Sequence, residues 1–128
     1  MGATKRTNYT EQQLQIADLF KALGHPARIA IIENLLADEL LKCKDLQARI
    51  PLAQSTISQH LKELYRNGII GYEQNYNCAY YKINDSAITL VREYLDKIKH
   101  TLDQSHRNLI DTYFRTGLFH LSELQLRI

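Results

Sequence analysis

Apolar residues recur at helical spacing in two successive stretches near the start of the chain. The first stretch predicts a helix over Glu11–Leu23, because Thr10 can cap its N terminus and Gly24 can end it. The second predicts a helix over Pro26–Ala37, since proline suits the first turn of a helix. This second stretch is apolar almost all round, so we expect the helix to lie at the centre of the fold.

Two further segments follow in the order helix, turn, helix. Asp45 and the apolar residues after it predict a short helix that Pro51 ends. A turn of about four residues then leads into an amphipathic helix that Gly68 closes. This order and spacing indicate a helix-turn-helix.

The second helix of this pair has an apolar side and a polar side. Ile57, Leu61 and Leu64 stand at positions i, i+4 and i+7, so they share one face. The opposite face is small, amide and basic, and consists of Ser55, Ser58, Gln59, Lys62 and Arg66. Such side chains reach phosphates and base edges when a helix enters a DNA major groove. An ordinary surface helix also carries a polar face, so the neighbouring elements have to decide between the two interpretations.

The hydrophobic period changes to that of strands after this helix. Residues 69–74 and 79–83 predict two strands. Residues 75–78 between them predict a tight turn in which asparagine takes left-handed backbone. A short hairpin directly after a recognition helix is typical of a wing that lies against DNA.

A long amphipathic helix is expected over residues 86–115. Its apolar residues follow a heptad interrupted by Ser105, and they are Ile88, Val91, Leu95, Ile98, Leu102 and Leu109. A helix of that length extends about 45 Å, beyond the core of a small domain. We therefore expect the stripe to pair with the same helix of a second copy; a helix wrapped around its own domain is the alternative. Residues 116–128 predict a short sixth helix that joins the same contact.

The composition places the chain among globular proteins. It has 128 residues, of which 45% are hydrophobic and 23% are charged, which suits one compact domain. The apolar runs are too short to span a membrane, and the polar N terminus lacks the apolar stretch of a signal peptide, so a cytoplasmic protein is expected. No glycine-rich phosphate loop, GxSxG or HExxH motif occurs, so we do not expect an enzyme.

The charge pattern supports nucleic acid as the partner. The net charge is only +2, but residues 42–66 carry five Lys/Arg and two Asp/Glu. Neutralisation of phosphates dominates affinity for nucleic acid. The basic excess therefore coincides with the predicted helix-turn-helix.

Three motifs occur in order along the chain: FKALGHPAR at residues 20–28, STISQHLK at residues 55–62, and NGII with YYKI at residues 67–70 and 80–83. They resemble the LxHPxR signature, the recognition helix and the wing of the arsenic-repressor (ArsR/SmtB) family of regulators. The resemblance covers about residues 14–85. It implies a winged helix-turn-helix, a dimer, binding to operator DNA, and an inducer that weakens this binding.

We therefore predict a single winged-helix domain over residues 1–128, mainly α with a small β-hairpin. Residues 45–66 form its helix-turn-helix and residues 69–84 its wing, while residues 10–24 and 86–126 are dimerisation helices. The expected function is that of a dimeric, sequence-specific regulator of transcription, a repressor released by an inducer. Its partners are double-stranded operator DNA and a second copy, without a membrane. A winged-helix adaptor that binds protein without reading DNA is the alternative.

The candidates for DNA contact lie on the recognition helix and the wing. They are Gln54, Ser55, Thr56, Ser58, Gln59, His60, Lys62, Arg66, Asn75 and Asn77. Serine and lysine are expected at phosphates and Gln59 at a base edge. Thr56 and His60 stand at the borders of the face, where they either touch DNA or pack. Arg28 is expected to hold the junction of the first two helices.

Many members of the family bind thiophilic metal through a Cys-x-Cys before the Asp-Leu that opens the third helix. Here Lys42 and Lys44 occupy both cysteine positions, and Cys43 lies at a different offset. One thiol between two cations cannot form a chelate. The cations favour a reactive thiolate, so Cys43 is a redox-thiol candidate, and an inert cysteine is the other interpretation.

Other members bind zinc on the last helix, through an Asp-x-His pair and a His-x-x-Glu pair. His120 and Glu123 match the second pair, whereas Asp103 and His106 are three residues apart instead of two. His100 lies on the same side of the helix as these two. A variant zinc site is geometrically feasible, and solvated polar residues on an exposed helix are the alternative.

Overall fold

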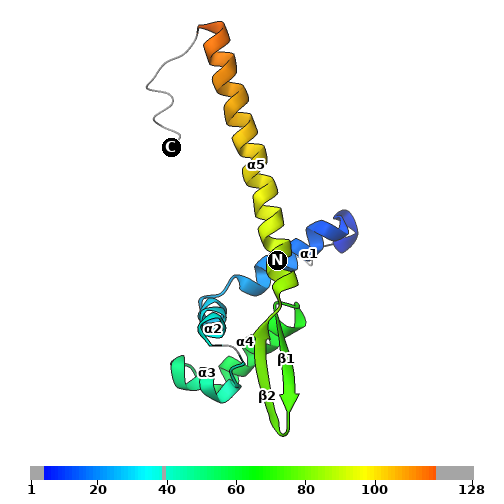
Figure 1. Ribbon diagram of the computed structural model, residues 1–128. Helices are drawn as coiled ribbons and strands as arrows, with labels where there is room; N and C mark the ends of the chain where they lie inside the picture. Colours follow the sequence, from blue (N-terminus) through cyan, green and yellow to red (C-terminus); the bar gives the residue numbers. More distant parts are fainter. Residues whose placement is uncertain (1–4, 39, 118–128) are drawn as a thin grey trace. The chain divides into compact units, whose positions relative to one another are not determined.

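The described residues, 5–38 and 40–117, fold into five α-helices and one two-stranded hairpin in the computed structural model. The elements follow in the order η1 (Arg6–Asn8), α1 (Glu11–Leu23), α2 (Pro26–Ala37), α3 (Cys43–Arg49), α4 (Gln54–Arg66), β1 (Ile70–Asn75), β2 (Cys78–Ile83) and α5 (Asp85–Thr116), as Figure 1 shows. This order confirms the predicted winged helix-turn-helix. The predicted sixth helix lies outside the described residues.

The chain divides into two compact units, Met1–Arg92 and Glu93–Ile128. The first unit contains the elements from α1 to β2 and the first turns of α5. The second contains, among the described residues, the rest of α5. No helix in the described ranges is long and apolar enough to cross a membrane.

Local signals set the ends of the helices. At the start of α1, the Gln13 N–H donates to the Thr10 hydroxyl at 3.1 Å, and the Thr10 N–H donates to the Gln13 side chain at 3.0 Å. This reciprocal pair satisfies donors that a helix start leaves open. Gly68 and Gly117 have φ angles of 75° and 69° just after α4 and α5. Glycine therefore ends both helices by taking left-handed backbone, as the sequence indicated for α4.

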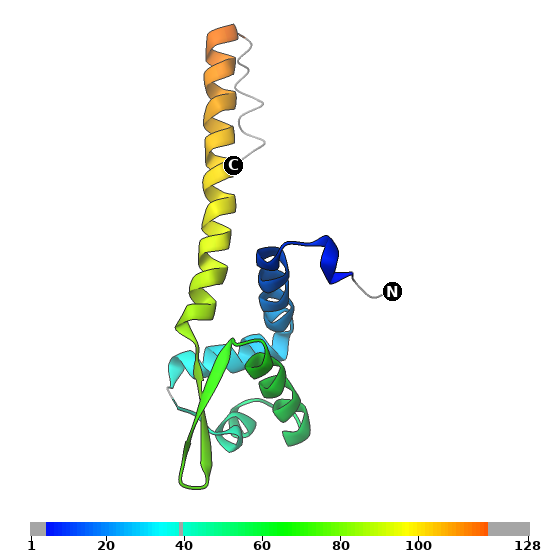
Figure 2. The same cartoon turned by 90° about the vertical axis from the view of Figure 1, so that its right-hand side faces the viewer.

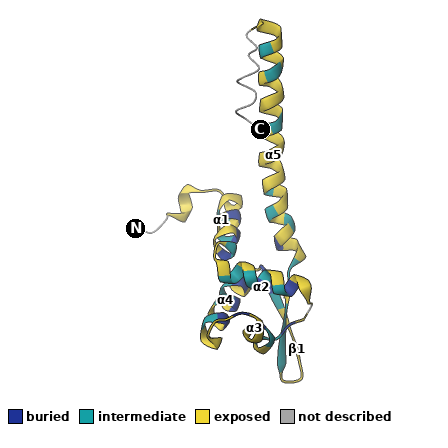
Figure 3. Ribbon diagram, turned by 90° about the vertical axis from the view of Figure 1, so that its left-hand side faces the viewer, coloured by how far each residue is buried: buried dark blue, intermediate teal, exposed yellow. Residues whose placement is uncertain are grey.

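The core of the first unit is built around α4. Ile57, Leu61 and Leu64 on its inner side are at most 2% exposed, which confirms the predicted apolar face. They share the core with buried residues of α2, α3 and the segment after α4, namely Ile31, Leu46, Ile69 and Ile70. Helix α4 contacts α1, α2, α3 and β1, so its polar side is the side left to solvent (Figure 3).

Helix α2 is not buried on all sides, which corrects the expectation from its sequence. Ile31 and Leu35 are buried, but Ile29 is 43% and Leu36 is 71% exposed. Ile29 and Leu36 are two turns apart and therefore lie on one side of the helix. The prediction was wrong because an apolar pattern does not reveal on which sides a helix finds neighbours.

The hairpin pairs its strands antiparallel, from Ile70 opposite Ile83 to Asn75 opposite Cys78. The turn between them contains two residues rather than the predicted four. Its left-handed residue is Tyr76, with a φ of 57°, and neither neighbouring asparagine adopts a positive φ. The prediction of a left-handed asparagine is therefore wrong, because the pairing of Asn75 with Cys78 leaves Tyr76 and Asn77 in the turn, and the first of these two residues takes the positive φ.

Helix α5 contains 32 residues and is about 48 Å long. None of the described residues 93–117 is buried, and the heptad residues Leu95, Ile98, Leu102 and Leu109 are 37–49% exposed. The predicted apolar stripe is thus present on the helix. Within the described part of this unit, nothing covers it.

Candidate nucleic-acid interface

Helix α4 presents its polar side to solvent at the position that a helix-turn-helix gives to its second helix. Four residues separate α3 from α4, as the sequence predicted. Most of the predicted DNA-contact side chains on α4 are exposed, and these are Gln54, Ser55, Ser58, Gln59 and Lys62. The Arg66 side chain is also exposed, at 64%, whereas Thr56 and His60 are half-buried at the borders of the face. The structure therefore brings these residues together on one helix.

The start of α4 has no side-chain cap, because the residue in front of it is Ala53. Its first backbone N–H groups carry the positive end of the helix dipole, which attracts phosphate oxygens. Beside this end, the Cys43 thiol lies 3.7 Å from the Ser58 hydroxyl. The first turn of α3 thus borders the polar face of α4.

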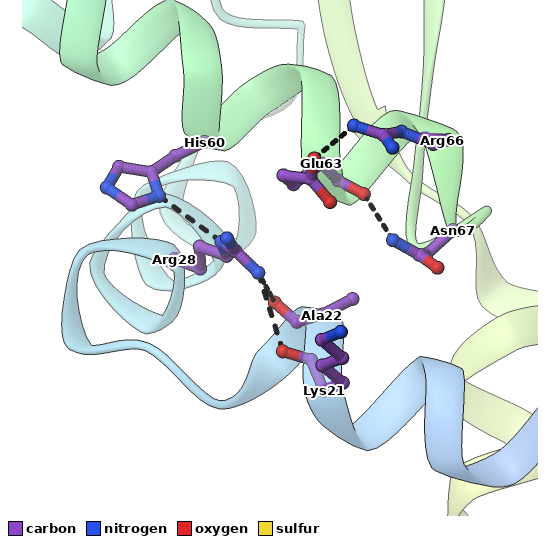
Figure 4. Close-up of polar contacts among 7 residues, drawn as sticks. All are labelled: Lys21, Ala22, Arg28, His60, Glu63, Arg66 and Asn67. Atoms are coloured by element: carbon purple, nitrogen blue, oxygen red, sulfur yellow. Dashed lines mark hydrogen bonds and ion pairs between the residues drawn. The ribbon is translucent and has the colours of Figure 1, made fainter. Parts of the chain in front are cut away.

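Arg28 connects α4 to the junction between α1 and α2. Its Nε donates to Nδ1 of His60 at 3.2 Å, and its Nη1 donates to the carbonyl oxygens of Ala22 and Lys21 at 3.1 Å and 3.4 Å. Figure 4 shows the guanidinium between the imidazole and these carbonyls. The contacts confirm that Arg28 holds this junction. Of the two alternatives for His60, they favour packing.

The environment of His60 disfavours its charged form. Burial lowers the pKa of His60, and the nearby His25 and Arg28 lower it further. The His25 ring lies 4.4 Å from the His60 ring between centroids. The native state therefore binds a proton at His60 less readily than the unfolded chain, in which histidine titrates at about pH 6.5.

We expect the free energy of unfolding to fall as the pH decreases from about 7 to about 5, because the unfolded chain takes up the proton more readily. Replacement of His60 by asparagine keeps an acceptor for Arg28 and removes the titration, so the fall should flatten. Thermal unfolding at several pH values measures this effect. An unchanged profile in His60→Asn would contradict the assignment.

A surface hollow of about 340 Å³ lies along the inner border of the polar face. It is lined by Arg28, Gln59, His60, Lys62, Glu63 and Arg66. Glu63 forms an ion pair with Arg66 (Figure 4). Three cations against one carboxylate leave this border positive, which suits a phosphate backbone.

The wing is attached to the helix-turn-helix at the start of α3. The Tyr81 N–H donates to the Leu41 carbonyl at 2.8 Å, so Leu41 forms an isolated antiparallel bridge with strand β2. The Lys42 ammonium lies over the Tyr80 ring, 5.2 Å from its centroid. Proximity to Cys78 and Tyr80 raises the pKa of Lys42, so this residue remains a cation beside the wing. The predicted contacts Asn75 and Asn77 are both exposed at the far end of the hairpin.

Comparison with known proteins relates the chain to helix-turn-helix regulators. A family described as a helix-turn-helix domain matches residues 23–71. The arsenical resistance operon repressor of Staphylococcus xylosus is 31% identical over 90 residues, which cover 70% of this chain and 85% of that protein. The chain belongs to the ArsR/SmtB family. A transcriptional repressor SmtB homolog of Synechocystis sp. is 30% identical over 90 residues, 70% of this chain and 67% of that one.

An ArsR-like regulator from Rhodococcus sp. has the same fold. It superimposes with a TM-score of 0.72 at 18% identity, over 80% of this chain and 96% of the other. Membership of the ArsR/SmtB family makes the protein a helix-turn-helix regulator of transcription that binds DNA, and not an enzyme.

The α3 residues do not fit a thiolate metal site of this family. Cys43 is the one thiol there, between Lys42 and Lys44, and it contacts Ser58. On α5, Asp103 forms an ion pair with Lys99 at 3.1 Å. Within residues 5–38 and 40–117, no three His, Cys, Asp or Glu side chains are placed to hold a metal ion. His120 and Glu123 lie outside the described residues.

Two contacts at this ArsR/SmtB interface were not predicted from the sequence. The bond between Arg28 and His60 spans 32 residues, and the cation–π contact joins Lys42 to Tyr80 across the fold. A signal for the first was available, since Arg28 and His60 belong to two of the motifs that carry the resemblance. No spacing rule in the sequence pointed to the second.

Proposed function

We propose that the protein is a dimeric, sequence-specific repressor that binds operator DNA through α4 and the wing. The observation that carries this proposal is the exposed polar side of α4, bordered by a hollow with three cations. This side contains two amides and a lysine that reach outward from a helix anchored on its other side in the core. A helix held in this way by the core keeps its exposed side chains in fixed positions, which suits the readout of bases.

Separate roles follow from side-chain chemistry. Gln59 is assigned to a base edge, because an amide both donates and accepts and can bind adenine bidentately. Ser55, Ser58 and Lys62 are assigned to phosphates, together with the open N terminus of α4. Asn75 and Asn77 are assigned to the DNA backbone beside the wing.

The dimer is proposed to form through α5. Its heptad residues Leu95, Ile98, Leu102 and Leu109 are 37–49% exposed and follow one side of the helix, which is the pattern of a two-stranded contact. Two copies related by a two-fold axis would present two α4 helices to a palindromic operator. This is the arrangement that helix-turn-helix dimers need.

Repression, rather than activation, is proposed because the two relatives described above are named repressors. Release by an inducer is part of the same proposal. The candidates for sensing are the Cys43 thiol and the polar residues His100, Asp103 and His106 of α5, with His120 and Glu123 beyond the described part.

Replacement of Gln59 or Lys62 by alanine tests the interface. Gln59→Ala should weaken binding to a duplex from the protein's own promoter about 10-fold to 100-fold, and mainly for the preferred sequence. Lys62→Ala should weaken binding to all sequences and reduce the salt slope by about 0.9 for each phosphate that is no longer neutralised. Fluorescence anisotropy across a salt series measures both effects.

Matched controls come from exposed residues of α5 away from the heptad. Gln104→Ala and Lys97→Ala remove the same chemical groups outside the interface and should retain wild-type affinity. Full binding by the double variant Gln59→Ala/Lys62→Ala would exclude α4 as the DNA-reading helix.

A further inference from the structure

Tyr76 occupies an unfavourable backbone conformation at the tip of the wing. Its φ of 57° lies in the left-handed region, which is costly for a residue with a bulky side chain. Asparagine tolerates this region far better, and an asparagine stands on each side of Tyr76. The pairing of Asn75 with Cys78 leaves Tyr76 and Asn77 in the turn, and Tyr76 rather than Asn77 takes the left-handed position.

Packing within the chain does not compensate for this conformation. Tyr76 is 93% exposed, the highest value among the exposed large apolar side chains in the described ranges. An exposed aromatic ring gains almost nothing from burial, so the tyrosine makes the folded state less stable than asparagine would. Residues kept in strained backbone conformations cluster at functional sites.

The hairpin is long enough to bring the Tyr76 ring to the minor groove of DNA beside the major groove that α4 would enter. From the pair Ile70–Ile83 to the pair Asn75–Cys78 it extends about 17 Å, at about 3.4 Å per residue. One turn of B-DNA is about 34 Å, so a minor groove lies about half a turn from the major groove that α4 would enter. Figures 1 and 2 both show the hairpin tip projecting past α3 and α4.

The chemistry of the tip favours an apolar contact over attraction to phosphate. Residues 74–79 contain no charged side chain. The nearest charges on the strands, Glu73 and Lys82, form an ion pair with each other. The tip therefore offers an uncharged aromatic ring, which suits the floor of a minor groove and its easily unstacked steps, while the amides of Asn75 and Asn77 on either side remain at the backbone.

We propose that Tyr76 is a wedge that enters the minor groove beside each half-site and reads the deformability of the flanking base step. The proposal rests on the proposed function and adds a determinant of specificity outside the sequence that α4 contacts. Pyrimidine–purine steps such as TA unstack most readily, so the ring selects operators with such a step in the flank.

The first test compares stability and affinity in Tyr76→Asn. The melting temperature should rise by about 2–5 °C, because the left-handed strain is relieved. Affinity for a duplex that the wild-type protein selects from a random library should fall about 10-fold, the scale of one aromatic–base stacking interaction. A higher melting temperature together with a lower affinity would show that Tyr76 lowers the stability of the protein and strengthens its binding to DNA.

Two further variants identify the group responsible. Tyr76→Phe keeps the ring and should recover most of the affinity that Tyr76→Asn loses. Tyr9→Asn removes a 50% exposed tyrosine far from the wing in sequence and should change neither affinity nor melting temperature. An affinity of Tyr76→Phe as weak as that of Tyr76→Asn would assign the contact to the hydroxyl and overturn the wedge.

The second test varies the DNA. The TA step in each flank of the selected duplex is replaced by GG, and 2-aminopurine is placed beside the step to report unstacking. The wild-type protein should bind the duplex with GG flanks several-fold more weakly than the original duplex. It should also raise the fluorescence of 2-aminopurine in the original duplex. Tyr76→Asn should show neither effect. Equal discrimination between the two duplexes by wild type and Tyr76→Asn would exclude the wedge.

The results separate this inference from the proposed function. Wild-type affinity in Tyr76→Asn, together with weak binding by Gln59→Ala, would refute the wedge and leave operator binding by α4 in place. Wild-type affinity in both variants would refute the assigned interface as a whole.

Discussion

Replacement of Leu102 by glutamate is expected to convert the dimer into a monomer. Leu102 is 48% exposed in the single chain, and glutamate is as good a helix former as leucine, so the monomer should fold normally. In the proposed dimer the change acts twice, because each copy buries an unpaired carboxylate in an apolar contact. The dissociation constant of the dimer should rise by more than about 100-fold, equivalent to about 2.7 kcal/mol.

Sedimentation across a concentration series measures this change, and circular dichroism confirms that the helices persist. The matched control is Gln104→Glu, which adds the same charge on the opposite side of α5 and should remain dimeric. The Leu102→Glu monomer should also bind a two-site operator at least about 10-fold more weakly, since the second half-site no longer adds to affinity. A dimer that survives Leu102→Glu would place the interface elsewhere.

Arg28→Ala is expected to cause the largest loss of stability among the polar substitutions considered. The change removes three hydrogen bonds and leaves the acceptors of Lys21, Ala22 and His60 without this donor. Hydrogen bonds from a charged donor contribute about 1.5–3 kcal/mol each, and the three share one guanidinium, so a total of about 3 kcal/mol is expected. The midpoint of thermal unfolding should fall by roughly 10 °C.

Arg28→Lys should recover little of this stability, because one ammonium cannot reproduce a planar fork that donates in two directions. Arg6→Ala provides the control, since Arg6 pairs with Asp18 at 3.1 Å on the surface and is 61% exposed. That substitution should cost at most about 0.5 kcal/mol. Equal destabilisation by Arg28→Ala and Arg6→Ala would show that the junction does not depend on Arg28.

Local rules of the sequence were sufficient where a residue acts on its own neighbours. Thr10 caps the helix that it precedes, and Gly68 follows the helix that it ends. The burial of Ile57, Leu61 and Leu64 follows from helical spacing alone. These features made the winged helix-turn-helix predictable, and the motifs added the family.

Features that depend on distant pairing were not predictable. The residues around Tyr76 did not indicate that it takes the left-handed position, because the register of the hairpin removes Asn75 from the turn and the type of turn then decides between Tyr76 and Asn77. The exposed stripe of Ile29 and Leu36 has the same origin, since the sequence does not reveal which neighbours α2 acquires. Local sequence signals therefore predicted the helices and strands, whereas contacts between distant residues determined the conformation of the turn and the exposed side of α2.

The junction between the wing and α5 restricts how such a chain can change in length. Asn84 is the single residue between β2 and α5, its N–H donates to the Ile69 carbonyl at 2.9 Å, and its side chain donates to the Gly68 carbonyl at 2.8 Å. Each residue of a helix is turned by about 100° from the last, so one inserted residue would turn Ile88 and Val91 away by that angle. Insertions and deletions at this point should survive selection only in multiples that restore the helical phase, such as about seven residues. Length variation among evolving relatives is therefore expected at the termini and not at this joint.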